Sequence, residues 1–237
     1  MNCVDYVIAL AGNPNTGKST VFNALTGLNQ HTGNWPGKTV AQATGSYVYN
    51  HKKYTLADLP GTYSLLAASV EEQIARDFLL FGNPQATIVV VDATCLERNL
   101  NLVLQVLEIT DRVVVCVNLM DEARRKGLAL DTAILERELG VPVIPTVARS
   151  ARGLEELKEA VADVAACRIK THPSRVIYPE AIEGAIKTLS AKLQPLLSRS
   201  NALRRRWIAL RLLDGDDTVL AALTDYFVKN SREEGTV

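Results

Sequence analysis

The 237-residue chain is poor in cysteine and has no excess of charge of either sign. Its four cysteines stand far apart, and no two of them form a C-x-x-C pair. This pattern argues against a disulfide framework and against the usual structural zinc sites. We expect Cys116 and Cys167 to be buried free thiols in a reducing, cytosolic compartment. The 26 basic and 26 acidic residues cancel, so a nucleic-acid partner is not expected.

Long hydrophobic runs are also missing. No stretch approaches the ~18 apolar residues of a membrane span, and no secretory signal precedes the first apolar run. The longest β-like apolar runs, Thr87–Val91 and Val113–Val117, have the length of buried strands. We therefore expect the chain as given to be soluble, and its 47% hydrophobic content is enough for a buried core.

Short apolar runs alternate with helical patterns from residue 5 to about residue 167. The alternation predicts an α/β fold, with a mostly parallel sheet and helices on both faces. Two runs that meet at Asn50 and His51 predict a hairpin, and hence one antiparallel edge strand. Strands are expected at Tyr6–Ala11, Gly45–Tyr49, Tyr54–Ala57, Thr87–Val91, Val113–Asn118 and Val141–Pro145, and helices at Ser19–Leu25, Val70–Phe81, Leu96–Thr110, Thr132–Leu139 and Leu154–Ala166.

The composition changes near residue 168. Residues 168–178 are polar and contain Pro173, so we interpret them as a linker between a domain of residues 1–167 and a second one of residues 179–237. In the second domain, apolar residues recur at the spacing of helices, which predicts a small all-α subdomain. We expect Trp207 in its core and a frayed tail over residues 231–237.

The segment Gly12-Asn13-Pro14-Asn15-Thr16-Gly17-Lys18-Ser19 matches G-x-x-x-x-G-K-[ST] at every fixed position. A strand pattern precedes it and a helical pattern follows, which is the context of a phosphate-binding loop. The backbone N–H groups and the helix N-terminus attract one anion, and we include Thr20 in this binding segment. Lys18 can reach the β- and γ-phosphates, and the Ser19 hydroxyl can ligate Mg²⁺.

Two later segments complete the predicted phosphate side. Asp58-Leu59-Pro60-Gly61 fits D-x-x-G, so Asp58 can hold Mg²⁺ through water and the Gly61 N–H can approach the γ-phosphate; an Asp-Pro-Gly turn is the plainer alternative. In the glycine-rich stretch Gly33–Thr39, Thr39 can ligate Mg²⁺, with Gly37 and Lys38 beside the nucleotide. We call the segment Thr62–Val70, which follows Gly61, the second switch.

Asn118-Leu119-Met120-Asp121 follows a predicted strand and fits N-x-x-D. The Asp121 carboxylate can accept two hydrogen bonds from guanine, which adenine cannot donate, while Leu119 covers the base; a helix N-cap at Asn118 is the alternative. Thr146, Val147 and Ala148 follow the last strand, and the Ala148 N–H can contact guanine O6. Val147 stands where Ser is commoner, so selectivity for GTP over ATP stays open.

These motifs together predict the G-domain type of P-loop NTPase fold, but the catalytic residue is missing. Thr62 stands where many GTPases place the Gln that orients the attacking water. We expect backbone groups near Thr39 and Gly61 to position this water, and we expect slow turnover. A nucleotidase that accepts both GTP and ATP, or a switch that binds without hydrolysis, are the alternatives.

The motifs Gly12–Ser19, Asn34-Trp35-Pro36-Gly37, Leu96-Glu97-Arg98-Asn99-Leu100 and Asn118–Asp121 closely resemble the cytosolic N-terminal part of the bacterial ferrous iron transport protein B (FeoB) family. The resemblance implies a Mg²⁺-dependent GTPase domain and a helical spacer domain resembling a GDP-dissociation inhibitor. It also implies a ferrous-iron permease that this chain lacks, at the cytoplasmic face of the bacterial inner membrane. Small Feo accessory proteins and homo-oligomers are further implied partners.

The resemblance also implies activation by K⁺. Asn15 would ligate this ion with carbonyl groups of Gly33–Gly37, so that K⁺ replaces an arginine finger. Acidic residues of the second switch couple to the helical domain in this family, and Glu71 and Glu72 match them, with a solvated helix face as the alternative. An iron site built from the three scattered histidines is not expected. The run Arg204–Arg206 could face anionic lipid or begin a solvated helix.

Overall fold

The computed structural model describes residues 5–27, 30–33, 42–66, 69–197 and 201–234. The predicted site residues Gly37, Lys38 and Thr39 lie outside these ranges, and so does Cys3, so their assignments remain predictions.

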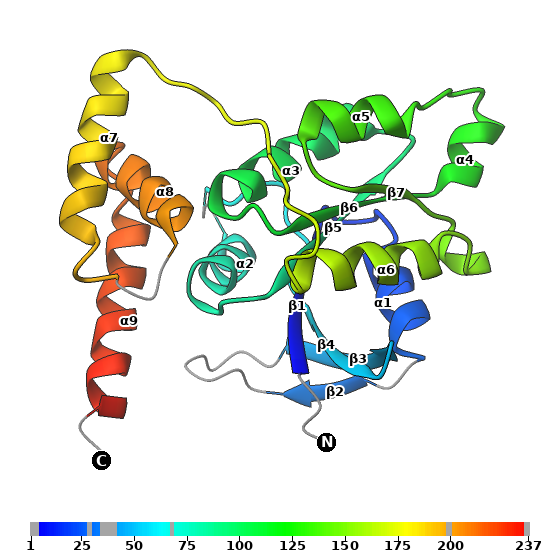
Figure 1. The fold of residues 1–237 in the computed structure, drawn as a ribbon, viewed down its shortest axis with the longest axis horizontal. Helices are drawn as coiled ribbons and strands as arrows, with labels where there is room; N and C mark the ends of the chain where they lie inside the picture. The colour runs from blue at the N-terminus through cyan, green and yellow to red at the C-terminus, as the bar shows by residue number, and fades with distance from the viewer. Residues whose placement is uncertain (1–4, 28–29, 34–41, 67–68, 198–200, 235–237) are drawn as a thin grey trace.

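The described strands form one sheet in the order β2-β3-β4-β1-β5-β6-β7 (Figure 1). β1 lies at the centre and pairs in parallel with β4 and β5, and β6 and β7 continue in parallel. The pairs β2–β3 and β3–β4 are antiparallel. The bounds are β1 Asp5–Gly12, β2 Gln30–Gly33, β3 Gln42–Tyr49, β4 Lys52–Asp58, β5 Ala86–Asp92, β6 Val113–Asn118 and β7 Val143–Pro145.

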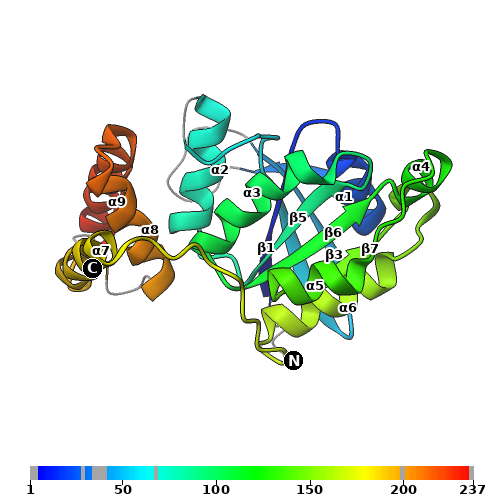
Figure 2. The ribbon, with the colours of Figure 1, turned by 90° about the horizontal axis from the view of Figure 1, so that it is seen from above.

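Helices cover both faces of the sheet, as the continuous apolar runs of β5 and β6 require (Figure 2). On one face, α1 (Lys18–Thr26) and α6 (Leu154–Ala165) pack around Phe22 and Val161. On the other face, α2 (Val70–Phe81), α3 (Leu96–Ile109) and α5 (Thr132–Leu139) pack around Leu79 and Leu107. A short helix, α4 (Met120–Arg125), follows β6, and a 3₁₀ turn, Ala148–Ser150, follows β7. The predicted α/β architecture is therefore confirmed.

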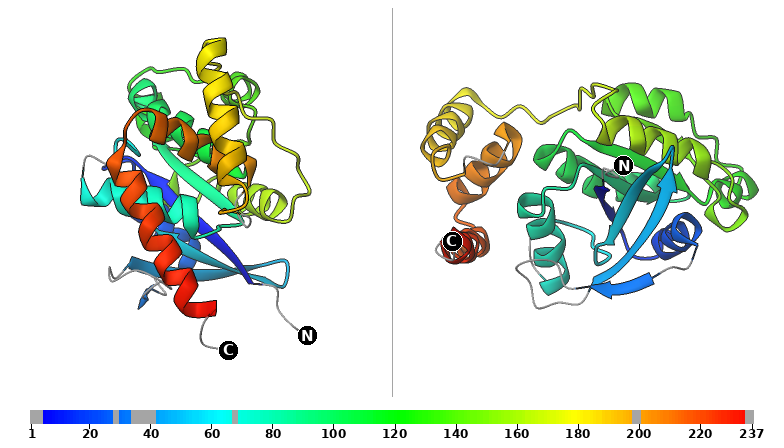
Figure 3. Two further views of the ribbon diagram at one scale, coloured as in Figure 1. Left: turned by 90° about the vertical axis from the view of Figure 1, so that its left-hand side faces the viewer. Right: turned by 60° about the horizontal axis from the view of Figure 1, so that its bottom comes forward.

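Three helices at the C-terminal end stand beside α2 and α3 (Figures 1 and 3). They are α7 (Glu180–Leu193), α8 (Ala202–Leu213) and α9 (Asp217–Glu234). Trp207 and Val219 are buried in the hydrophobic cluster that also contains Leu79 and Leu107. The helical part and the sheet therefore share one continuous core, and the prediction of Trp207 as a core residue is confirmed.

Several local predictions were wrong. The hairpin β3–β4 and an antiparallel edge are confirmed, but the edge strand itself, β2, was missed, because the polar sequence Gln30–Gly33 has no alternating apolar pattern to reveal a strand. The polar helix α4 was missed for the same reason. The helix α9 continues through residues 231–234, where Arg and Glu favour helix over a frayed tail. Cys116 is buried as predicted, but Cys167 is exposed, because it lies beyond α6 in a left-handed turn.

Residues 168–178 contain no helix or strand, but part of this segment is bonded to the sheet domain. The His172 N–H donates to the Gly140 carbonyl at 2.9 Å, and the Ser174 N–H donates to the Leu139 carbonyl at 3.1 Å. The Thr171 hydroxyl donates to the Asp111 carbonyl at 2.6 Å. We call residues 171–174 the strap, because they lie along the end of α5 instead of spanning free solvent.

Candidate nucleotide-binding site

Four loops with chemical motifs meet at one edge of the sheet. The loop Gly12–Lys18 follows β1, Asp58–Gly61 follows β4, Asn118–Asp121 follows β6 and Thr146–Ala148 follows β7. These strands are parallel and lie close together in the sheet, so their carboxyl ends bring the loops to the same side. This edge is where open α/β sheets bind ligands.

The loop after β1 has the backbone of an anion-binding nest. Asn15 and Gly17 both adopt left-handed conformations, with φ of 67° and 79°. A side chain at Gly17 would clash with the Asn118 amide, so glycine is required there by backbone and by space. The Thr16 hydroxyl bonds to the Asn13 carbonyl at 2.9 Å and fixes the curl, and α1 begins at Lys18. The loop can therefore present N–H groups and a helix N-terminus to a phosphate.

Asn118 ties this phosphate loop to the loop after β7. Its Nδ2 donates to the Thr16 carbonyl at 3.1 Å, while its Oδ1 accepts from the Ala148 N–H at 3.0 Å and from the Thr146 hydroxyl at 3.3 Å. The residue is 1% exposed, so these bonds lie inside the protein. The N-cap position of α4 is Leu119, and the Asn118 side chain is used between the loops.

Lys18 and Asp58 form an ion pair, and their side chains are only 12% and 18% exposed. The structure thus brings together the cation predicted for the phosphates and the carboxylate predicted for Mg²⁺. The Ser19 hydroxyl and the Asp58 carboxylate are hard oxygen donors, which fits Mg²⁺. Among the described residues, no group of three or more His, Cys, Asp and Glu side chains could enclose a metal ion. This donor set suits an ion that also binds substrate phosphates.

The predicted base-binding residues lie on two facing loops. Leu119 adopts a left-handed conformation with φ of 62°, and the Met120 N–H donates to the Thr146 carbonyl at 3.3 Å. The Asp121 carboxylate faces Arg149, with Oδ2 at 2.9 Å from Nη2. The sequence did not single out Arg149, because an exposed arginine in a loop carries no motif signal. The two loops are thus joined by an ion pair at the rim and by Asn118 at the base.

The floor of this region contains a buried thiol. Cys116 Sγ lies 3.2 Å from the Thr146 hydroxyl, and Thr146 itself is buried. Burial raises the pKa of the Cys116 thiol from its ordinary value of 9.0 to about 12. The thiol therefore stays neutral at physiological pH and acts as a packing group beneath the base loop.

The start of the second switch is held against the phosphate loop. The Thr62 N–H donates to the Gly12 carbonyl at 3.2 Å, and the Thr62 hydroxyl donates to the Ser64 carbonyl at 2.6 Å. Thr62 is buried, and its hydroxyl closes a local turn. A Cβ at Gly61 would meet Pro14 N at 3.4 Å, an ordinary packing distance. Neither the packing nor the backbone requires glycine at position 61, which points to a ligand as the reason for it.

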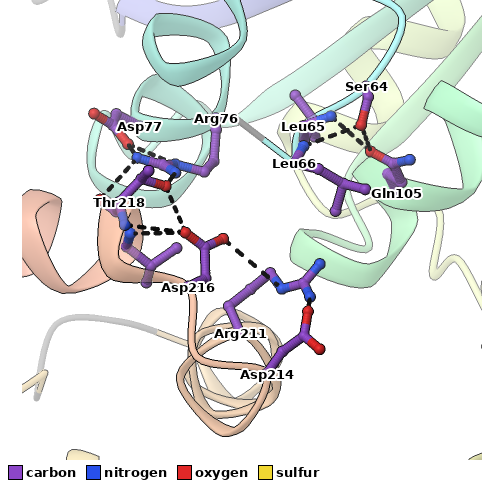
Figure 4. Close-up of polar contacts among 11 residues, drawn as sticks. Ser64, Leu65, Leu66, Arg76, Asp77, Gln105, Arg211, Asp214, Asp216 and Thr218 are labelled. Atoms are coloured by element: carbon purple, nitrogen blue, oxygen red, sulfur yellow. Dashed lines mark hydrogen bonds and ion pairs between the residues drawn. The ribbon is translucent and has the colours of Figure 1, made fainter. Parts of the chain in front are cut away.

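A buried arginine on α2 carries a polar link to the helical part (Figure 4). Arg76 is 1% exposed; its Nη1 donates to the Thr218 hydroxyl at 2.6 Å, and its Nε donates to Asp77 Oδ1 at 2.8 Å. Arg76 on α2 thus bonds to α9. An arginine in an amphipathic helix is usually interpreted as solvated, so this link could not be predicted from the sequence. The coupling to the helical domain that the family resemblance implied for Glu71 and Glu72 stays a prediction.

The cluster Arg204–Arg206 does not form the outward basic patch considered above. Arg204 is 5% exposed and donates to the Asn83 side chain, and burial lowers the pKa of its guanidinium. Arg206 pairs with Glu183 at 2.8 Å. Both guanidinium groups are therefore used inside the protein, which overturns the lipid-facing interpretation for them. No helix in the described part of the chain is long and apolar enough to cross a membrane.

Comparison with known proteins identifies relatives over nearly the whole chain. The family model described as "Ferrous iron transport protein B" matches residues 6–161, and "FeoB cytosolic helical domain" matches residues 178–235. The Fe(2+) transporter FeoB of Escherichia coli (strain K12) is 41% identical over 213 residues, covering 88% of this chain and 27% of that protein. A Porphyromonas gingivalis FeoA/FeoB fusion protein is 40% identical over 211 residues, covering 88% of this chain and 25% of that protein. The chain thus spans about a quarter of the length of these relatives.

Solved structures give the same result. The cytosolic domain of T. maritima FeoB in a GDP form matches with a TM-score of 0.81 and 38% identity, covering 94% of this chain and 86% of that one. The cytosolic domain of L. pneumophila FeoB matches with a TM-score of 0.77 and 35% identity, covering 92% of this chain and 93% of that one.

Proposed function

The chain belongs to the FeoB family of ferrous iron transport proteins, and on this premise we propose that residues 1–167 are a Mg²⁺-dependent GTPase that regulates an Fe²⁺ permease. The main support is the position of Asn118, which joins the phosphate loop to the base loop through Thr16 and Ala148. One nucleotide spanning both loops would explain this link. The T. maritima relative has structures in GDP and GMPPNP forms.

The phosphate end of the proposed site uses residues that are already adjacent. Backbone groups from Gly12 to Thr20 would surround the phosphates, and the Lys18 ammonium would pair with them. Ser19, Asp58 and Thr39 would hold Mg²⁺. The bound Mg²⁺ neutralises charge on the phosphate oxygens. Because Asp58 is paired with Lys18 in this structure, binding of both phosphate and Mg²⁺ would give each partner an opposite charge in exchange.

The hydrolytic step would depend on backbone groups, because Thr62 closes a turn and does not reach for water. We assign the positioning of water to groups near Thr39 and Gly61, and a K⁺ site to Asn15. The exposed Asn15 amide oxygen is a hard donor that suits an alkali cation. The bound K⁺ supplies the positive charge that an arginine finger gives to other GTPases.

Guanine would be recognised by Asp121, with Leu119 against the base. Binding of ATP is the second candidate function, and the contact at Ala148 favours it. The Ala148 N–H, predicted for guanine O6, donates to Asn118 here, so guanine must share this donor or do without it. Absence of that contact would reduce the preference for GTP.

The role in the whole protein follows from the relatives and remains part of the proposal. Residues 179–237 would act as the helical spacer domain, joined through the linker 168–178, and would pass the nucleotide state to a permease in the bacterial inner membrane. Small Feo accessory proteins and a homo-oligomer are further proposed partners. The helical domain could also control release of GDP.

Phosphate release from GTP by this chain, in KCl and in NaCl at fixed Mg²⁺ with ATP in parallel, tests the proposal. We expect hydrolysis of GTP well above that of ATP, stimulated several-fold by K⁺. Asn15→Ala should remove the stimulation. Asn50→Ala is the matched control, because Asn50 is exposed and has a left-handed backbone in the β3–β4 hairpin. Equal rates in both salts would refute the K⁺ role, and equal use of ATP would favour the nucleotidase.

A further inference from the structure

A glutamine on α3 binds residues 64 and 65 of the second switch (Figure 4). Gln105 Oε1 accepts a hydrogen bond from the Leu65 N–H at 2.6 Å and another from the Ser64 hydroxyl at 3.2 Å. The Leu65 side chain is buried in the core shared with α3, and this residue is 1% exposed. One side-chain oxygen from a rigid helix therefore binds two donors of the segment that follows the D-x-x-G motif.

The contact extends further along the switch. The Ser64 hydroxyl also accepts from the Leu66 N–H at 3.0 Å. Ser64 is joined back to Thr62, because its N–H donates to the Thr62 hydroxyl at 3.2 Å. Gln105 thus orders residues 64–66 directly or through one hydroxyl, and it connects them to the turn around Thr62.

Gly61 lies between two fixed points as a result. On one side, Thr62 N–H is bonded to the Gly12 carbonyl of the phosphate loop. On the other side, the turn ends at Leu65, which is held by Gln105 and by its own burial. If either point were released, the Gly61 N–H would no longer have a fixed direction relative to the phosphate loop.

We propose that Gln105 is a positioning residue for GTP hydrolysis, acting through Leu65 and Ser64 on the backbone of Gly61 and Thr62. The inference rests on the proposed function, since it concerns the reaction at that site. It supplies part of what the missing Gln after D-x-x-G would give, because it fixes residues 64–66 of the second switch from a neighbouring helix. Gln105 itself does not touch the nucleotide in this account.

The chemistry of the contact explains why glutamine suits the position. Both donors, a backbone N–H and a hydroxyl, need an acceptor, and a neutral amide oxygen accepts both without placing a charge near the phosphates. Loss of the acceptor would leave the buried Leu65 N–H without its partner, which is costly for a folded segment. The segment would then adopt other arrangements in which this N–H reaches water, and hydrolysis would slow.

The test compares three variants of this chain on α3. Gln105→Met keeps the length and packing of the side chain but removes the acceptor. Gln105→Glu restores an oxygen acceptor for both donors. Asn101→Ala, an exposed position one turn earlier on the same helix, is the control. The measurements are kcat and KM for GTP, GDP affinity, and amide hydrogen exchange at Leu65 in the GDP complex.

We expect Gln105→Met to lower kcat about five- to tenfold, the size expected when one buried bond is lost. GDP affinity should change less than twofold, and exchange at Leu65 should be faster. Gln105→Glu should recover part of the rate, because it restores the acceptor but adds a negative charge, and Asn101→Ala should match the parent. A parent-like or higher kcat in Gln105→Met would overturn the inference while GTPase activity stands. If the parent chain itself hydrolyses no GTP, the proposed function fails first, and the inference fails with it.

Discussion

The four loops of the candidate nucleotide-binding site, which we call the nucleotide edge, and the contact between α2 and α9 place their charged groups differently. At the nucleotide edge, a neutral side chain, Asn118, makes the internal bonds, while the charges of Lys18 and Asp58 are only partly buried. At the α2–α9 contact, the guanidinium of Arg76 is fully buried and bonded to Thr218. A site for a charged ligand must keep its own charges within reach, whereas an internal contact can enclose them.

The two regions also differ in how clearly the sequence predicts them. The nucleotide edge was recognisable from motifs, because the proposed ligands, phosphate and guanine, require particular groups at fixed spacing. The contact between α2 and α9 depends on the fit of packed side chains, such as the stacked rings of Phe81 and Tyr226, whose centroids lie 4.7 Å apart. It also depends on the pairing of Arg76 with Thr218, which no sequence spacing indicates. Ligand chemistry is therefore readable from sequence, and internal coupling is much less so.

The largest effect should come from the buried charge. Arg76→Met removes the buried guanidinium that bonds to Thr218 and leaves Asp77 facing an apolar side chain. We therefore expect a loss of about 3 kcal/mol in the free energy of unfolding. GDP affinity should change little. Arg124→Met, at an exposed position on α4, is the control and should stay near the parent. Denaturant unfolding and GDP titration measure both quantities, and a strong loss of affinity with unchanged stability would reverse the comparison.

Substitution of Asn118 should lower both the stability of the chain and its affinity for GDP. Asn118→Ala leaves the Thr16 carbonyl and the Ala148 N–H without partners, which should cost about 2 kcal/mol of stability and weaken GDP binding more than tenfold. Asn99→Ala is the matched control. Asn99 is also buried and accepts a hydrogen bond from the Asp92 N–H at 2.9 Å, at the end of the neighbouring strand β5. A similar loss of affinity in both variants would show that Asn118 acts only through general stability.

Substitution of Gly61 should lower the rate of GTP hydrolysis and leave the stability of the chain unchanged. Gly61→Ala fits the available space, so the unfolding free energy should stay within about 0.5 kcal/mol of the parent. Hydrolysis of GTP should fall about tenfold, because the new methyl group occupies the approach to the phosphate. Gly184→Ala on α7 adds a methyl group in open space and should leave the rate unchanged. Unchanged turnover in Gly61→Ala would remove Gly61 from the proposed site.

The last effect is absent at neutral pH and appears only in alkaline solution. The unfolded chain ionises Cys116 above its ordinary pKa of 9.0, while the folded chain keeps the thiol neutral up to about 12. The raised pKa therefore contributes stability that is complete below pH 9.0 and falls as the pH rises toward 12, by up to about 1.4 kcal/mol per pH unit. Unfolding curves at several alkaline pH values should show this slope in the parent and in Cys167→Ala, but a smaller slope in Cys116→Ala. Equal slopes in all three chains would contradict it.

Particular residues show which parts of the structure could be predicted from the sequence. The buried strands β5 and β6 were predictable because Ile88–Val91 and Val113–Val117 are continuous apolar runs. The four loops were predictable because the proposed nucleotide requires particular residue types at fixed spacing. The edge strand β2 was missed because polar edge residues need no pattern. Gln105 and Arg76 were missed because each partner lies far away in the sequence, so only the fold brings donor and acceptor together.

The strap leaves little free chain between the sheet domain and the helical domain. Residues 171–174 are bonded to the sheet domain, and soon afterwards the Val176 N–H donates to Glu108 on α3 at 3.1 Å while the Val176 carbonyl accepts from Arg206 on α8 at 3.2 Å. A tether with so little slack keeps two surfaces at a high effective concentration, of the millimolar order estimated for short connections. The contact between α2 and α9 can therefore be modest in intrinsic affinity and still be formed most of the time. Lengthening the segment between Ser174 and Val176 would dilute that contact without altering a single residue in it.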